Sequence, residues 1–366
     1  MPLPRGLSAG WTGHDLPTVA LTYGLGIAGG LAAKAAHLPL PMLVGSLLAV
    51  GTAALALWRP FGRPVGAPQA LRTVFVPVIG VAIGSAFHPG IGAEMARWWP
   101  SLLLLAAFLP VAHVAVFLVF RATGRIDPAT AWYGAAPGGM IENVEMGLER
   151  GAEVRMLTML QFLRLIVVIL LVPLTFSVIE GHAVGSAGGA ALPGAAAPAP
   201  AEAALLAAAA VLGALAGIGA RLPAGHVTGP ILLSALLHVT GLVRAAPPQW
   251  IIEAAQVVVG VSLGVRFAGM ARAEFAAALG LACLNVAAVC GAALALAFAM
   301  HGALGQPAAA VFLAFAPGGL VEMGLIALSL NLSVAYVTVH HVARIVIAVA
   351  VSRALGGRMA GARPPP

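Results

Sequence analysis

Two stretches of the chain combine a helix-breaking motif with one acidic and one basic residue at fixed spacing. They are Ala136-Pro137-Gly138-Gly139-Met140-Ile141-Glu142 and Ala316-Pro317-Gly318-Gly319-Leu320-Val321-Glu322. An arginine follows each glutamate by 22 residues, Arg164 in the first stretch and Arg344 in the second. A carboxylate can take up a proton or a cation, and a planar guanidinium can bind an anion through paired hydrogen bonds. The two stretches therefore predict a binding site for charged solutes.

The Pro-Gly-Gly sequences interrupt apolar helical runs. Unsatisfied backbone groups are costly in hydrocarbon, so such a break must be buried in protein or face a wet cavity. The helix that resumes after the break exposes N–H groups, and its dipole favours anions. We therefore expect the two breaks to line a polar region that could hold a carboxylate, a phosphate or a small inorganic anion.

The four charged residues of the motifs each admit two interpretations. Glu142 and Glu322 fall in the first turn after a break, where a carboxylate either caps free N–H groups or binds a cation or a proton. Arg164 and Arg344 stand about eleven residues into apolar helices, too deep to reach water easily. Each arginine either forms an ion pair with the glutamate of its own motif or recognises an anionic substrate.

Polar residues near the motifs extend the candidate site. Asn143 follows Glu142, and Gln161 and His341 occupy equivalent positions three residues before the arginines. These three side chains are predicted to face the same polar region. Further polar residues close to the motifs are Glu145, Thr158, Thr338 and His340.

The sequence contains no motif typical of a metal site or a nucleotide-binding site, and its two cysteines are not placed to form a disulfide with each other. His340 and His341 are adjacent, so on a regular helix they point about 100° apart and do not readily share one ion. There is no Walker motif and no nucleotide-binding glycine-rich unit. Cys283 and Cys290 lie about 10 Å apart along one predicted helix and cannot pair with each other. We expect no metal, no cofactor and no coupling to ATP within this chain.

The composition places the motifs in a membrane. Of 366 residues, 61% are hydrophobic and 8% are charged, and the mean hydropathy is +1.00. These values predict a polytopic membrane protein, because the polar surface is too small for a soluble fold. The net charge of +7 comes from 18 arginines and one lysine scattered singly, so we expect no nucleic-acid partner. Residues 1–13 hold one arginine and no apolar segment, which argues against a cleaved signal peptide.

The two motifs belong to an internal duplication. The offset of 180 positions that relates them also carries Gly80 and Gly84 onto Gly260 and Gly264. Both glycine pairs have the spacing that permits close backbone contact between membrane helices. The predicted organisation is a first membrane repeat at 1–180, an Ala/Gly/Pro linker at 181–200 and a second membrane repeat at 201–366.

Each repeat contains five long apolar runs and one broken run. In the first repeat the apolar runs are 16–36, 39–58, 71–88, 99–120 and 153–179, and the broken run is 129–150. In the second repeat they are 201–220, 226–243, 250–268, 275–300 and 333–352, and the broken run is 307–330. Every run is predicted to be helical, so the expected fold class is all-α.

The positions of the basic residues favour one of two membrane topologies. If all twelve segments span, ten basic residues face the cytoplasm and seven face outside. If each broken run enters and leaves on one side, the counts become fourteen and three, with Arg164 and Arg344 within the membrane. The second model has five spans per repeat, so the repeats are inverted and both termini are cytoplasmic. Twelve spans are the alternative.

The duplicated A-P-G-G-x-x-E motif followed by arginine, in an apolar chain of this length, resembles the AbrB family of bacterial membrane proteins. The family motif falls on Ala136, Pro137, Gly138, Gly139, Glu142 and Arg164, and on Ala316, Pro317, Gly318, Gly319, Glu322 and Arg344. Met323 matches the residue that usually follows the glutamate, whereas Asn143 departs from it. The resemblance implies a membrane location and a transport-like fold, and it implies no particular substrate. The soluble DNA-binding regulator of the same name has a fold that this composition does not fit.

Three functions are compatible with these features. The leading hypothesis is an ion- or proton-coupled secondary transporter of the bacterial inner membrane that moves a small, anionic solute through a site at the two breaks. A membrane metallo-oxygenase is the first alternative, because the family also carries an ammonia monooxygenase description. A membrane regulator that senses a ligand in the same site is the second. A homo-oligomer is compatible with all three.

Overall fold

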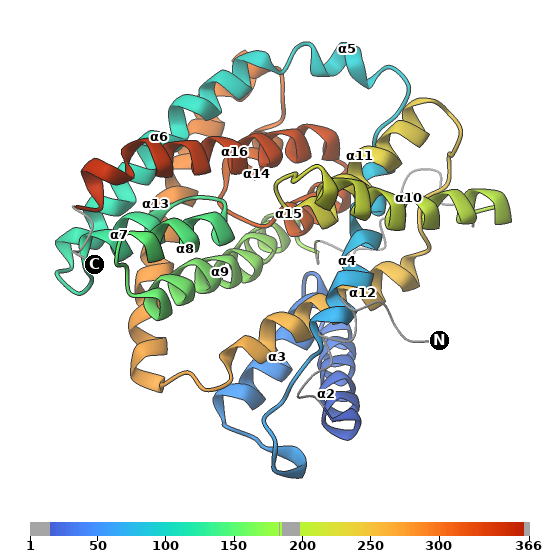
Figure 1. The fold of residues 1–366 in the computed structure, drawn as a ribbon. Helices are drawn as coiled ribbons and strands as arrows, with labels where there is room; N and C mark the ends of the chain where they lie inside the picture. Colours follow the sequence, from blue (N-terminus) through green and yellow to red (C-terminus); the bar gives the residue numbers. More distant parts are fainter. Residues whose placement is uncertain (1–14, 183, 185–197, 362–366) are drawn as a thin grey trace. The chain divides into compact units, whose positions relative to one another are not determined.

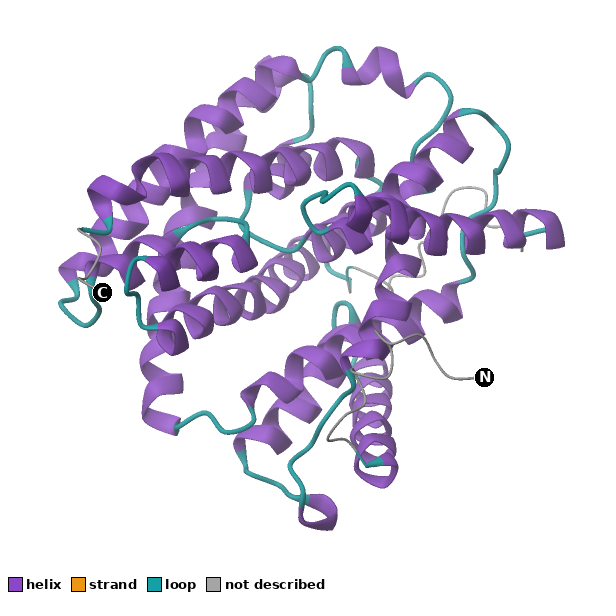
Figure 2. Cartoon of the chain, viewed as in Figure 1, coloured by secondary structure: helices purple, strands orange, loops and turns teal. Residues whose placement is uncertain are grey.

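The computed structural model describes residues 15–182, 184 and 198–361. Most of the predicted linker at 181–200 and the predicted uncleaved N-terminal segment 1–13 lie outside these ranges. All regular structure within the described residues is helical, as Figure 2 shows, with no strand among them. The all-α fold class is confirmed.

The same order of helices occurs twice along the chain (Figure 1). The helices of the first half are α2 (Leu16–Ala35), α3 (Pro41–Leu55), α4 (Gln69–Gly84), α6 (Trp99–Ala122), α7 (Pro128–Ala135), α8 (Met140–Glu149) and α9 (Val154–Glu180). Those of the second half are α10 (Pro200–Gly219), α11 (Gly225–Val239), α12 (Gln249–Gly264), α13 (Arg272–Leu304), α14 (Ala308–Phe315), α15 (Leu320–Ser329) and α16 (Val334–Met359). Short helices occur at η1 (Pro60–Gly62), α5 (Ile91–Met95) and η3 (Val265–Phe267). Four helix pairs begin 180 positions apart: α4 and α12, α7 and α14, α8 and α15, and α9 and α16.

Seven helices among the described residues are long and apolar enough to cross a membrane. They are α2, α6, α9, α10, α12 extended through η3, α13 and α16. The helices α3, α4 and α11 are apolar but shorter, with 15, 16 and 15 residues. Together these ten helices coincide with the ten unbroken runs of the sequence. The chain is therefore a helical, multi-pass membrane-type protein, while the inverted arrangement of its repeats stays a prediction.

Contacts between residues group the chain into two compact units. Unit 1 takes the described residues within Met1–Ile91, Val172–Met270 and Leu328–Asn331. Unit 2 takes those within Gly92–Leu171, Ala271–Ala327 and Leu332–Pro366. Each unit draws on both halves of the sequence, so the units are not the predicted repeats, whose boundaries remain a prediction.

In unit 1, helices from one half of the sequence pack closely on helices from the other half. A Cβ atom added at Gly84 of α4 would lie 2.6 Å from the Ile231 carbonyl oxygen of α11. A Cβ at Gly264 of α12 would lie 3.0 Å from the Leu47 carbonyl oxygen of α3. Only glycine allows the backbones to approach this closely, so the predicted helix contacts at the two glycine pairs are confirmed.

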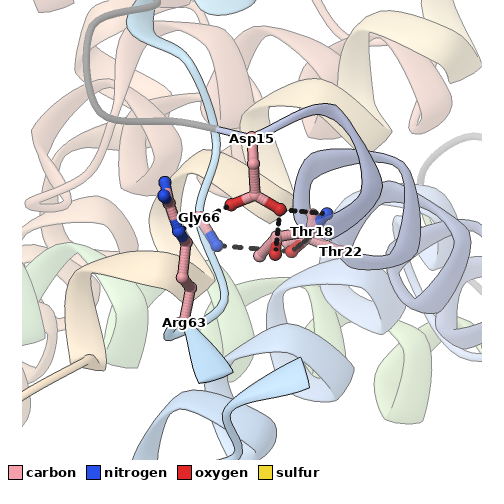
Figure 3. Close-up of polar contacts among 5 residues, drawn as sticks. All are labelled: Asp15, Thr18, Thr22, Arg63 and Gly66. Atoms are coloured by element: carbon pink, nitrogen blue, oxygen red, sulfur yellow. Dashed lines mark hydrogen bonds and ion pairs between the residues drawn. The ribbon is translucent and has the colours of Figure 1, made fainter. Parts of the chain in front are cut away.

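Polar contacts fix the first turn of α2 within unit 1 (Figure 3). Asp15 is the N-cap residue, and its Oδ2 accepts hydrogen bonds from Thr18 N at 3.1 Å and Thr18 Oγ1 at 2.7 Å. Its Oδ1 lies 3.4 Å from Nε of Arg63, and Thr22 Oγ1 accepts a hydrogen bond from Gly66 N at 3.3 Å. The Thr18 hydroxyl in particular holds the pKa of the Asp15 carboxyl below its ordinary value, because it stabilises the charged form.

Unit 2 contains both Pro-Gly-Gly breaks and both arginines of the motifs, Arg164 and Arg344. Its helices are α6, α7, α8, α13, α14 and α16, with most of α9 and α15. The two cysteines on α13 are free, as their spacing predicts, with Cys283 exposed and Cys290 buried.

Candidate binding site at the two helix breaks

The first break separates α7 from α8. Ala136 leaves the helix with φ −58° and ψ 128°, an extended conformation that the following proline favours. Gly139 then adopts φ +67°, a left-handed conformation that side-chain-bearing residues rarely take, and α8 begins at Met140. Ala136, Pro137 and Gly138 are buried. The sequence therefore forms the expected break, and the freed backbone lies inside the protein.

The second break separates α14 from α15 in the same way. Ala316 has φ −59° and ψ 142°, and α15 begins at Leu320. Ala316, Pro317 and Gly318 are buried. Both breaks thus leave carbonyl groups at the end of a short helix without intrahelical partners, and in a membrane these groups need other donors.

The two arginines supply hydrogen bonds to these carbonyls. Arg164, whose residue is 2% exposed, donates from Nη1 to the carbonyl of Ala136. Arg344, also 2% exposed, donates from Nη1 to the carbonyl of Ala316 and from Nη2 to that of Gly318. The partner of each arginine is therefore the backbone of the break that precedes it in sequence.

For Arg164 the structure shows a backbone carbonyl as the partner and not the glutamate of its own motif. Within the described residues, Arg164 makes its hydrogen bond to Ala136 and forms no ion pair with Glu142. A hydrogen bond to a carbonyl leaves the charge uncompensated, whereas an ion pair would have neutralised it.

Gln161 and His341 contact backbone carbonyls in the helical turn before each break. Gln161 Nε2 donates to the carbonyl of Tyr133, and His341 Nε2 lies 2.8 Å from the carbonyl of Leu313, to which it can donate. Tyr133 and Leu313 are themselves 180 positions apart. The two predicted residues therefore have equivalent positions and equivalent acceptors, although their side chains differ.

Asn143 and Met323 distinguish the two copies. Asn143 is fully buried, and its Nδ2 donates to the carbonyls of Gly138 at 2.6 Å and Gly139 at 2.7 Å. In the second copy Arg344 donates to the equivalent carbonyl of Gly318, and the Met323 side chain packs beside that glycine. Asn143 thus replaces one hydrogen bond that the arginine makes in the other copy.

The glutamates of the motifs lie beside the N-termini of their own helices. A Cβ atom added at Gly139 would lie 3.3 Å from Glu142 Oε2, and a Cβ at Gly319 would collide with the Glu322 carboxylate. Such positions suit the capping interpretation, because the carboxylate meets the positive end of the helix dipole. Their burial differs, since Glu322 is 7% exposed whereas Glu142 is only partly buried.

Each break packs against the arginine helix of the other half. A Cβ at Gly138 would lie 3.4 Å from Ala348 Cβ and 3.5 Å from Ile345 Cα, both on α16. A Cβ at Gly318 would lie 3.2 Å from Val168 Cγ1 on α9. The two breaks and the two arginines therefore form one centre within unit 2.

The centre carries charge of both signs. The charges of Arg164 and Glu322 both act on Arg344, the first repelling it and the second attracting it. Several buried polar atoms of this centre have no hydrogen-bond partner among the described residues: Nε of Arg164, Nε of Arg344, Oδ1 of Asn143, Oε1 of Gln161 and Nδ1 of His341. Guanidinium donors and amide acceptors with free capacity are suited to binding a polar solute.

The remaining sequence-predicted residues lie around this centre in different ways. Thr338 is 3% exposed, Thr158 is partly buried and Glu145 is exposed. Among the described residues no group of three or more His, Cys, Asp or Glu side chains could hold a metal ion. Sequence reasoning missed Ser101 of α6, which contacts His340 across 239 positions, and no local pattern signals such a distant contact.

An open groove of about 910 Å³ belongs to unit 1. It is lined by Leu25, Leu48, Ala49, Thr52, Ala53, Ala56, Leu57, Trp58 and Arg59. Its walls are mostly apolar and face outward, as expected for a surface that contacts lipid. The buried polar centre of unit 2 is the better candidate for a solute site because its polar groups converge.

Comparisons with known proteins identify the family of this chain. A family model described as "Transition state regulatory protein AbrB" matches residues 51–358. A protein of Escherichia coli (strain K12) named "Putative regulator AbrB" is 24% identical over 307 residues, which cover 83% of this chain and 85% of that protein. "Uncharacterized protein YhjN" of Bacillus subtilis (strain 168) is 23% identical over 295 residues, covering 75% of this chain and 74% of that protein. Because the family model spans both breaks and both arginines, this chain belongs to the AbrB family.

Proposed function

We propose that this AbrB-family membrane protein is a secondary transporter of the bacterial inner membrane that moves a small anionic solute. The observation that carries the proposal is that each break packs against the arginine helix of the other half, with Gly138 beside α16 and Gly318 beside α9. Broken helices that come together within an apolar helical protein are the usual construction of a transporter's solute site.

The charges of the centre favour an anion. Arg164 and Arg344 are buried, and their hydrogen bonds to backbone carbonyls leave both positive charges in place. Glu322 offsets one of them. A solute with one or more carboxylate or phosphate groups would compensate the remaining charge and would also use the free Nε donors.

The close packing of the breaks implies how the solute enters. A methyl group added at Gly138 would touch α16 and one added at Gly318 would touch α9, so little free space separates each break from its neighbouring helix in this conformation. Movement of a break away from its neighbouring helix would open the centre. Inverted repeats, with five spans and one broken helix each, would allow the same movement to open either face of the membrane in turn.

A flux measurement tests the proposal. Purified protein is reconstituted into liposomes, an inward proton or sodium gradient is imposed, and uptake is measured for a panel of radiolabelled mono-, di- and tricarboxylates and phosphate esters. We expect gradient-dependent uptake of at least one anion, and we expect Arg344→Gln to abolish it while Arg353→Gln, a change at an exposed arginine of the same helix, retains it.

Other outcomes would favour other functions. Saturable binding of an anion without any flux would support a ligand-sensing regulator, the role that the name of the Escherichia coli relative suggests for that protein. Neither flux nor binding with any member of the panel would contradict a solute site for anions. Stoichiometric copper or iron in the purified protein would favour the oxygenase alternative.

A further inference from the structure

A buried serine–histidine pair joins α6 to α16 in unit 2. Ser101 is 2% exposed and His340 is fully buried, and Ser101 Oγ lies 2.8 Å from His340 Nε2. The other ring nitrogen, Nδ1, lies 2.8 Å from the backbone carbonyl of Tyr336. Since a carbonyl only accepts, Nδ1 carries a hydrogen, and the protonation state of the ring is decided at Nε2.

The hydroxyl of Ser101 can serve both protonation states of the imidazole. Ser101 Oγ is also 2.9 Å from the carbonyl of Trp98, which accepts its hydrogen. When His340 is neutral, the single hydroxyl hydrogen can be donated to Nε2. When Nε2 carries a proton, that N–H donates to Ser101 Oγ while the hydroxyl donates to Trp98. Rotation of one hydroxyl therefore satisfies the ring before and after it binds a proton.

Aromatic rings surround the imidazole. The ring of Tyr336 lies 4.1 Å from that of His340, and the ring of Phe315 lies 6.1 Å from it. Trp98 in turn packs edge-on against Tyr336 at 5.5 Å. The Tyr336 ring lies within the distance at which an aromatic ring attracts a cation, so this contact offsets part of the cost of burying a protonated imidazole.

The Ser101–His340 pair lies close to the start of α6 and one helical turn before Arg344 on α16. Ser101 is in the first turn of α6, and Arg344 is four residues after His340, about 6 Å along α16. The titratable residues near His340 on its own helix are Tyr336, His341 and Arg344. Four helices among the described residues pack against α16. Of these, α14 has no titratable residue, and α6 has His113 and Arg121, 12 and 20 residues beyond Ser101. The others are Tyr133 on α7 and Glu142, Glu145 and Glu149 on α8.

We propose that His340, with Ser101 as its hydrogen-bond partner, is the proton-binding site that couples the proton gradient to movement of the anionic solute; this rests on the proposed transport function. A proton binds at Nε2 and adds a positive charge one turn from Arg344, which raises the affinity for the anion. By reciprocity the bound anion raises the affinity for the proton, so the two are carried together. In the orientation that the basic residues favour, Trp98 and Ser101 are at the outer face, where the proton would enter.

The proton site can be tested without knowing the solute. Protein labelled with ¹⁵N-histidine is placed in lipid nanodiscs, and imidazole nitrogen spectra are recorded from pH 9 to pH 2.5. The His340 signals are assigned by their loss in His340→Gln. We expect a ring with hydrogen on Nδ1 alone at high pH that gains a second N–H as the pH falls. In Ser101→Ala the midpoint should move about one unit lower, because the protonated ring loses its acceptor.

The control is His301→Gln, which changes an exposed histidine on α13 and should leave the His340 titration unaltered. Circular dichroism establishes that each variant is folded at each pH. A His340 ring that keeps one protonation state throughout, or a midpoint unchanged by Ser101→Ala, would overturn the inference. If a transported anion is found, His340→Gln should remove the pH dependence of its flux. The titration result stands even if no anion is transported, so failure of the proton site and failure of the transport proposal are distinguishable.

Discussion

The two copies of the break motif have the same backbone path, but different side chains donate hydrogen bonds to their backbone carbonyls. In the second copy Arg344 donates to two carbonyls, those of Ala316 and Gly318. In the first copy Arg164 donates to Ala136, and Asn143 donates to Gly138. In both copies these backbone carbonyls receive a side-chain hydrogen bond, because an unpaired carbonyl inside a membrane protein is costly.

The copies also differ in how deeply their second helices are buried. Seven residues of α15 are buried, including Glu322, whereas Asn143 and Gly147 are the buried residues of α8. The glutamate of the first copy is therefore closer to the protein surface than that of the second. This difference predicts that the two glutamates have different roles, with Glu322 acting on the charge of Arg344.

The largest difference between the copies should appear when the arginines are replaced. Arg164→Met and Arg344→Met both remove one buried charge, and Arg344→Met also removes the positive charge that attracts Glu322. Arg344→Met leaves one more carbonyl without a donor, which costs about 1–3 kcal/mol. Thermal unfolding in detergent should therefore show the larger loss for Arg344→Met. Equal losses would mean that the second hydrogen bond contributes nothing.

Replacing the residue after each glutamate should give a smaller asymmetry. Asn143→Leu leaves the carbonyls of Gly138 and Gly139 without the side-chain amide and should destabilise the protein by about 1–3 kcal/mol. Met323→Leu conserves volume and should cost less than about 1.5 kcal/mol. The same unfolding assay compares the two. A well-tolerated Asn143→Met would show that Arg164 can take over Gly138, which would make the two copies interchangeable.

Neighbouring glycines of the first break should respond differently to alanine. Gly139→Ala places a side chain at φ +67° and against Val349, which should cost about 1–2 kcal/mol. Gly138→Ala places its methyl group in ordinary contact with Ala348, so its effect should be under about 1 kcal/mol. Urea or thermal unfolding of the two variants provides the measurement. The reverse order would show that the break has another backbone path.

The smallest expected effect on stability comes from the N-termini of another pair of helices, α2 and α10, each of which is the first helix of its half. Asp15 caps α2 through Thr18, whereas α10 is capped by Glu202, whose Oε2 accepts a hydrogen bond from Ala199 N at 3.2 Å. Because the pKa of Asp15 is lowered in the folded state, its contribution to stability is fully present above its ordinary pKa. The contribution disappears as the pH falls through the lowered value.

The pH dependence of Tm gives the measurement for Asp15. Wild type and Asp15→Asn should differ at pH 6 and converge as the pH falls below 3.8, the ordinary value for Asp. Thr18→Val, which removes the hydroxyl donor, should reduce the difference at pH 6. A difference that persists unchanged at low pH would show that the charge of Asp15 is not responsible for it.

Much of the fold follows from local features of the sequence, because apolar runs and Pro-Gly-Gly breaks act over a few residues. The breaks at Gly139 and Gly319 and the helix contacts at Gly84 and Gly264 are of this kind. The roles of the arginines are not, since their acceptors are backbone carbonyls that carry no sequence signal. Asn143 departs from the family pattern, which indicates that the first copy differs from the second. The structural role of Asn143 becomes clear only from the position of the Gly138 carbonyl, to which it donates a hydrogen bond.

The contact between Ser101 and His340 illustrates a second limit. The residues come from different halves of the chain, and neither has a repeat counterpart with the same chemistry: Leu281 and Leu160 occupy the equivalent positions. A repeat-based prediction therefore gives no indication of this site. It depends on how α6 packs on α16, which only the tertiary structure specifies.

The most direct test of the account asks whether the first break lies on the arginine helix of the other half. Gly138→Cys and Ala348→Cys are combined in a background with Cys283→Ala and Cys290→Ala. The distance of 3.4 Å between the two Cβ positions is close to that of a disulfide, so oxidation in the membrane should join them rapidly. The control pair, Gly138→Cys with Leu355→Cys, is about 10 Å further along α16 and should not react. No bond in the first pair, or equal reaction of both pairs, would contradict a centre built from the two breaks.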